Sequence, residues 1–111
     1  MSKKFIVLYH APISAREQMA NATPEQTKAG MDAWMSWSRK VQGSMIDLGS
    51  PLGNRRTLGT AASDHNSTVV GYSVLQSTSE QAIADLLKDH PHLHMPGFSI
   101  EIFESLPLPG M

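Results

Sequence analysis

The sequence contains no cysteine, and this absence excludes several kinds of chemistry at once. Without cysteine there is no disulfide framework, thiolate metal site, iron–sulfur cluster or cysteine nucleophile. Charge is also scarce, because only 17% of the residues are charged and the formal net charge is −1. A nucleic-acid binder carries a surplus of basic residues, so we expect no nucleic-acid partner.

Long apolar runs are missing as well. The apolar run at residues 5–9 is too short for the hydrophobic region of a secretion signal. No stretch approaches the roughly 18 apolar residues of a membrane span, so we expect a cytoplasmic protein with no membrane partner. With 41% hydrophobic residues, the 111-residue chain can build one core, which predicts a single domain over residues 1–111.

Four segments have the composition of β-strands, at residues 5–9, 45–48, 68–75 and 98–102. In the last segment apolar and polar residues alternate, which places Phe98, Ile100 and Ile102 on one face. Gly71 interrupts the third segment. We expect it to mark a β-bulge or the close approach of another group.

Two helices are predicted between these strands. The sequence Thr23-Pro24-Glu25-Gln26 has a capping threonine, a proline at the first helical position and a glutamine three residues after the cap. This helix should end near Gly43. A second helix is expected over residues 80–89, with Ser79 as its cap and Pro91 preventing its continuation.

The order strand, helix, strand occurs twice, which predicts an α+β fold of the ferredoxin-like βαββαβ type. This fold has a four-stranded antiparallel sheet with two helices on one face. The polar residues 53–67 are expected to form a long loop in the middle of the chain. The other sheet face would be open, and Val70, Tyr72, Ile100 and Ile102 are candidates for it. We expect a homodimer to form through this open sheet face.

Several segments also match a known pattern in order and spacing. They are the strand 5–9, the run 43–52, the Val-Gly-Tyr-Ser-Val-Leu strand 70–75, and His90-Pro91 followed by Gly97 and Ile100-Glu101. Together they resemble the YCII-related family, which includes the DGPF-type proteins and belongs to the dimeric α/β-barrel superfamily. The resemblance implies a ferredoxin-like, dimeric α/β-barrel fold, and that superfamily hosts many different reactions.

Two departures from the family pattern affect the expected chemistry. The acidic DGPF segment is absent, and the run Ser63-Asp64-His65-Asn66-Ser67 occupies roughly its place. Where one branch of the family often carries a histidine in the first helix, this chain has Asp32. A family-type pair of histidine and aspartate therefore does not carry over to this chain.

Histidines are the most prominent candidates for chemistry. His90, His92 and His94 occupy alternate positions before the last strand, and imidazoles titrate near neutral pH and bind metals. The alternatives here are loop and capping roles, a pocket acid or base, or a metal site. His10 follows Tyr9 at the end of the first strand, where it could enter a pocket or be an exposed turn residue.

The first predicted helix and the following loop supply further candidates. Asp32 is close in sequence to Trp34, and a carboxylate partly shielded from water by an indole suits a general acid or base. The alternative is a solvated helix carboxylate. Trp34 and Trp37 could form the walls of a pocket for an aromatic molecule or pack in the core. Arg55 and Arg56 could hold an anionic group or remain surface charges.

These considerations favour a small homodimeric enzyme that performs acid–base chemistry on a small molecule, of the isomerase, lyase or dehydrochlorinase kind. The expected catalytic residues are His10, Asp32, His92 and His94, and the expected substrate-binding residues are Tyr9, Trp34, Trp37, Arg55, Arg56 and His65. No metal or cofactor is expected. The alternatives are a non-catalytic module that binds a small metabolite and, less favoured, a haem protein with a histidine ligand.

Overall fold

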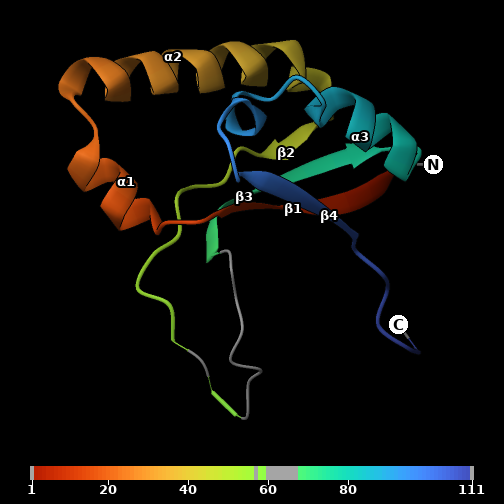
Figure 1. Cartoon of the computed structure of the whole chain (residues 1–111). Helices are drawn as coiled ribbons and strands as arrows, with labels where there is room; N and C mark the ends of the chain where they lie inside the picture. The colour runs from red at the N-terminus through yellow and green to blue at the C-terminus, as the bar shows by residue number, and fades with distance from the viewer. Residues whose placement is uncertain (1, 57, 60–67, 111) are drawn as a thin grey trace.

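The computed structural model describes residues 2–56, 58, 59 and 68–110 (Figure 1). Its centre is a four-stranded antiparallel sheet in the order β2-β3-β1-β4. The strands are β1 (Lys3–Ala11), β2 (Met45–Asp47), β3 (Thr68–Ser77) and β4 (Ser99–Glu104). All four predicted strands are confirmed. The fold is α+β, and its strand order is compatible with a ferredoxin-like fold.

The helices lie beside one face of the sheet (Figure 1). Within the described part of the chain they are α1 (Ala15–Asn21), α2 (Pro24–Lys40) and α3 (Glu80–Leu87), with short 3-10 helices η1 (Gln42–Ser44) and η2 (Pro91–His94). The prediction of two helices was incomplete, because it missed α1. Seven residues are too few for helical periodicity to be clear, although Ser14 caps α1 by accepting a hydrogen bond from the Glu17 backbone N–H.

The start of α2 confirms the prediction from the sequence. The Thr23 hydroxyl oxygen accepts a hydrogen bond of 3.1 Å from the Gln26 backbone N–H. In return the Gln26 side-chain oxygen accepts one of 2.9 Å from the Thr23 backbone N–H. This reciprocal pair satisfies two N–H groups that the first helical turn leaves without intrahelical partners.

Side chains of β1 alternate between the two faces of the sheet. Phe5, Val7, Tyr9 and Ala11 are buried beneath the helices, and they form the centre of the hydrophobic core. The intervening residues, which include His10, are half-buried and point to the other face. Neighbouring side chains on β1 therefore point to opposite faces of the sheet.

A β-bulge in β3 changes which of its residues face the helices. Tyr9 pairs with Gly71 and His10 pairs with Val69, so Val70 is the extra residue. Val70 is 8% exposed and packs with the core, so its predicted place on the open sheet face was wrong. Both expectations for Gly71 are confirmed. The bulge residue Val70 is its neighbour, and a Cβ at Gly71 would lie 3.3 Å from the Ser50 carbonyl oxygen.

The open sheet face also differs from the prediction at β4. Ile100 and Ile102 pair with core residues Tyr9 and Val7, and they pack against the core. Directly opposed residues in antiparallel strands share a face, so both isoleucines face the helices. Tyr72, in contrast, pairs with Leu8, so its side chain takes the open face as expected, although the residue also borders a cavity on the helix side. The apolar and aromatic residues of the open sheet face are Ile6, Leu8, Tyr72, Val74 and Phe103.

Candidate functional site

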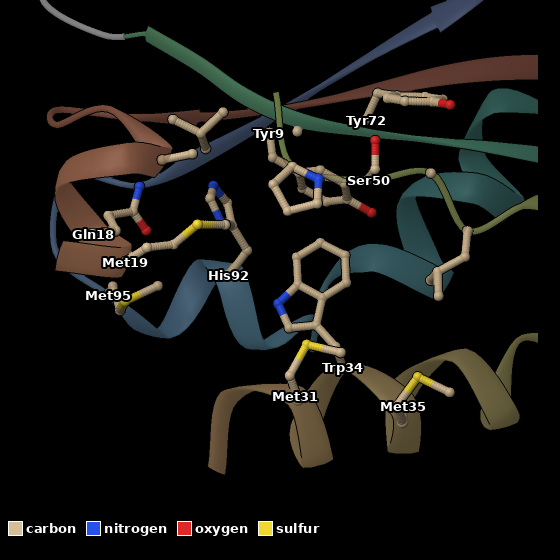
Figure 2. Close-up of a pocket in the computed structure, with 16 residues that line it drawn as sticks. Tyr9, Gln18, Met19, Met31, Trp34, Met35, Ser50, Tyr72, His92 and Met95 are labelled. Carbon is tan, nitrogen blue, oxygen red and sulfur yellow. The ribbon is translucent and has the colours of Figure 1, made fainter. Parts of the chain in front are cut away.

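A cavity of about 270 Å³ lies between the sheet and the helices α1 and α2 (Figure 2). Its lining residues come from β1, α1, α2, β3, the segment after β2 and the region of η2. They are Tyr9, Ala15, Gln18, Met19, Met31, Trp34, Met35, Leu48, Gly49, Ser50, Pro51, Val70, Gly71, Tyr72, His92 and Met95. Among these described lining residues there is no Asp, Glu, Lys or Arg. We call this space the helix-side pocket.

The segment after β2 forms one wall of the helix-side pocket. The chain turns at Gly49, which has a φ of +81°, and the Asp47 carboxylate accepts a hydrogen bond of 2.8 Å from the Gly49 N–H. A Cβ at Gly49 would lie 1.7 Å from the Tyr72 carbonyl oxygen, so only glycine fits. The segment then runs beside β3, where the Leu52 N–H donates to the Val70 carbonyl at 2.9 Å.

An aromatic cluster made of Tyr9, Trp34, Trp37, His90 and His92 forms the opposite side of the pocket and the core behind it. The Tyr9 ring centroid lies 4.8 Å from that of Trp34, 5.0 Å from that of His90 and 5.3 Å from that of His92. Most of these pairs are edge-to-face, the arrangement that aromatic quadrupoles favour. The cluster holds Trp34 and His92 in place beside the cavity.

The Tyr9 phenol belongs to a short chain of hydrogen bonds. The Ser73 hydroxyl donates to the Leu48 carbonyl at 2.6 Å, so the Tyr9 hydroxyl donates its own proton to Ser73 Oγ at 2.8 Å. Burial raises the pKa of Tyr9 to about 12, although the hydrogen bond with Ser73 opposes the shift. Tyr9 therefore stays neutral at physiological pH.

His90 is fully buried, and its ring is neutral. Burial lowers the pKa of His90 to about 3, and nearby His92 and His94 act in the same direction. Its Nδ1 accepts a hydrogen bond of 2.9 Å from the His92 backbone N–H, so Nε2 carries the proton. Among the described residues Nε2 has no hydrogen-bond partner, and the ring packs edge-on against Trp34 and Trp37 at centroid distances of 4.4 and 4.3 Å.

His92 is the imidazole that lines the pocket. It is 4% exposed, and its Nε2 donates a hydrogen bond of 2.8 Å to the His10 carbonyl. Burial lowers the pKa of His92, although hydrogen bonds with the backbone of His10 and Ser99 oppose that shift. The structure therefore presents a neutral, oriented imidazole to the cavity. Because Tyr9 is neutral too, neither Tyr9 nor His92 carries a charge near pH 7.

The structure brings some of the predicted site residues together. Tyr9, Trp34 and His92 all line the helix-side pocket, although they come from three separate elements (Figure 2). Trp37 is buried beside Trp34, where its indole N–H donates to the Leu86 carbonyl at 3.0 Å. Trp37 is thus a core residue behind the pocket. Packing in the core was one of the two roles that the sequence allowed for it.

Three other predicted catalytic residues lie away from the pocket. His10 is on the open sheet face, where its Nε2 lies 2.5 Å from a carboxylate oxygen of Glu101. Asp32 is exposed on α2 and pairs with Lys28 at 3.5 Å, as the alternative of a solvated carboxylate expects. His94 is exposed at the end of η2. These three do not converge with His92 on one site.

The remaining candidates come from the predicted loop 53–67, of which the structure describes only residues 53–56, 58 and 59. Arg55 and Arg56 are exposed, and neither is among the residues that line the pocket. His65 lies outside the described residues. His90 caps η2, which agrees with the capping role weighed for it, but nothing in the sequence indicated that its imidazole is buried. The sequence-based prediction also left out the four methionines of the lining. Two of these methionines, Met31 and Met35, could have been predicted from the sequence, because their spacing places them on one helix face with Trp34.

The described residues give no indication of a metal centre, since no group of three His, Asp or Glu side chains among them could hold an ion. No helix in the described part of the chain is long and apolar enough to cross a membrane. Comparison with known proteins found no family model that matches the chain and no match among the curated proteins.

Proposed function

We propose that this protein binds a small, uncharged and mainly aromatic molecule in the helix-side pocket. The observation that carries the proposal is the composition of the lining, in which apolar and aromatic side chains surround neutral Tyr9 and His92 and no described lining residue is charged. An ionised ligand would lose hydration there and gain no opposite charge. A neutral ring system gains apolar contacts and edge-to-face contacts with Trp34.

The size of the pocket limits the ligand further. Its volume of about 270 Å³ is slightly below the roughly 300 Å³ at which ordinary ligand pockets begin. This suits a molecule of up to three aromatic rings. The polar groups available to orient such a molecule include the Gln18 amide and the Ser50 hydroxyl, which Figure 2 shows around the cavity.

A matched pair of fluorescent probes tests the proposal. N-phenyl-1-naphthylamine is uncharged, whereas 1-anilinonaphthalene-8-sulfonate has the same ring system with a negative charge. We expect the neutral probe to bind one site per chain at least tenfold more tightly than the sulfonate. Equal binding of both probes, or no saturable binding of the neutral one, would overturn the proposal.

Two valine substitutions on β3 localise the binding. Val70→Phe adds bulk on the pocket side, so it should abolish binding of the neutral probe. Val74→Phe makes the same change on the open sheet face and should leave the affinity unchanged. Thermal unfolding of both variants establishes that each is folded before the affinities are compared.

A second candidate function is proton transfer on the bound molecule, with His92 as general base. It is favoured by the neutral, oriented imidazole that lines the pocket. A carbon acid such as a small lactone, incubated in D₂O, should exchange its proton next to the carbonyl faster with the protein present, and His92→Gln should remove the effect. Simple binding is better supported, because the backbone of His10 and of Ser99 already engages the His92 ring.

We also propose that the chain is a relative of the YCII-related family and forms its homodimer through the open sheet face. The first part rests on the resemblance carried by segments such as 43–52 and 70–75, and the strand order is compatible with it. The apolar residues of the open sheet face support the second, since Phe103 is 49% exposed there and the helices cover the other face (Figure 1). Two such faces packed together would form a dimeric α/β barrel. Sedimentation equilibrium of the whole chain tests this, and a monomer would contradict it.

A further inference from the structure

We propose that oxidation of the methionines around the helix-side pocket switches ligand binding off. Four of the five methionines in the described part of the chain line this pocket, namely Met19, Met31, Met35 and Met95. They come from α1, from α2 and from the segment after η2, so they border the cavity from three different elements (Figure 2). The inference rests on the proposed binding function, and it adds a modification site and a form of regulation.

The four pocket methionines are accessible to an oxidant in solution. Met19 is 61% exposed, Met31 55%, Met35 39% and Met95 43%. Met45, in contrast, is partly buried and packs against the core. Because thioether oxidation follows exposure, the pocket methionines should react before Met45.

The reaction that we infer uses hydrogen peroxide as the oxidant. A lone pair of the thioether sulfur attacks one peroxide oxygen, the O–O bond breaks, and a sulfur–oxygen bond forms. The sulfur loses two electrons, the peroxide is reduced, and one molecule of water leaves. The product is methionine sulfoxide, which reductases convert back to methionine, so the change is reversible.

The sulfoxide changes the property on which binding depends. Each S=O group places a strong dipole where the lining is apolar, and a bound ring would deprive that group of water without offering a hydrogen bond. Methionine is also flexible enough to fit around ligands of different shape, and a polar sulfoxide fits them less well. We expect at least a tenfold loss of affinity for an uncharged aromatic probe.

The test combines peptide mass spectrometry with N-phenyl-1-naphthylamine binding. The whole chain is treated with increasing peroxide, each methionine is followed by its gain of one oxygen, and probe affinity is measured at every step. The affinity should fall as the four pocket methionines react, and methionine sulfoxide reductases should restore it. Saturating probe present during the treatment should slow oxidation at these four positions and leave the rate at Met45 unchanged.

Substitution by leucine separates the switch from general damage, because leucine has a similar size and cannot be oxidised by peroxide. Changing all four pocket methionines to leucine should make probe affinity insensitive to peroxide, judged against the same variant before treatment, whereas Met45→Leu should remain sensitive. If the fourfold variant does not fold, the double variant Met31→Leu/Met35→Leu should lose less affinity than the unmodified chain.

The outcomes also distinguish this inference from the function on which it rests. An untreated protein that does not bind the probe would overturn both. Probe binding that survives complete oxidation of the four pocket methionines would overturn the switch alone and leave the proposed function standing. Equal peroxide sensitivity of the fourfold variant and the unmodified chain would likewise overturn the switch.

Discussion

Acid should destabilise this protein through the buried imidazole of His90. The ring is fully buried and neutral, and its pKa is lowered from 6.5 to about 3. Between these values the unfolded chain binds a proton at this position and the folded chain does not. The contribution of the neutral His90 ring to the free energy of unfolding is therefore fully present above about pH 6.5 and is lost as the pH falls towards 3.

The magnitude follows from the size of this window. One proton difference lowers the free energy of unfolding by about 1.4 kcal/mol per pH unit. For His90 the loss amounts to about 2 kcal/mol between pH 7 and pH 5. That is a large part of the ~5–15 kcal/mol by which folded domains are usually stable. His92, whose pKa is also lowered by burial, adds to the same slope.

Urea denaturation at a series of pH values and one protein concentration measures the slope. His90→Asn keeps an acceptor for the His92 N–H and removes the titrating group, so it should be less stable at pH 7 but lose less stability on acidification. His94→Asn changes the exposed histidine of the same 3-10 helix and leaves burial, the largest cause of the lowered pKa of His90, in place, so most of the slope should remain. A His90→Asn variant with the original slope would refute the reasoning.

Three further predictions concern the framework around the pocket. Gly49→Ala should lower the free energy of unfolding in urea by more than about 2 kcal/mol, because it forces an alanine into the left-handed conformation and its Cβ against the backbone. Gly53→Ala has free space around the new Cβ, so its free energy of unfolding should stay within about 0.5 kcal/mol of that of the unmodified chain. Thr23→Ala removes the cap of α2 and should cost about 1 kcal/mol in the same assay; no loss would show that the capping box is not stabilising. Leu8→Lys on the open sheet face should convert the proposed dimer to a monomer in sedimentation equilibrium, and Leu93→Lys on η2 should leave the dimer intact. A dimer that survives Leu8→Lys would place the interface elsewhere.

The elements of the fold could be predicted where local chemistry is strong. The capping box at Thr23 specifies the start of α2, and the β-branched run of residues 68–75 specifies most of β3. Helix α1 could not be found in the same way, because its seven residues are stabilised by a cap and by burial of Ala15 rather than by a repeated apolar pattern.

The candidate site was harder to predict because it depends on which face each side chain takes. Tyr9 and His10 are neighbours on β1, so strand geometry alone sends them to opposite faces, and only Tyr9 reaches the pocket. Asp32 follows Met31 on α2, but the turn of the helix carries it out to solvent. His92 and His94 are alternate residues whose roles the sequence left open, and the 3-10 helix buries His92 and exposes His94.

The most direct test of the proposed function uses the methionine methyl groups as reporters. With ¹³C-labelled methionine methyls, NMR spectra are recorded while N-phenyl-1-naphthylamine is added to the whole chain. We expect saturable shifts for Met19, Met31, Met35 and Met95, which line the pocket, and little change for Met45, which packs against the core. Unchanged pocket methyls, or shifts spread equally over Met45 and the pocket methionines, would contradict a specific site between the helices and the sheet.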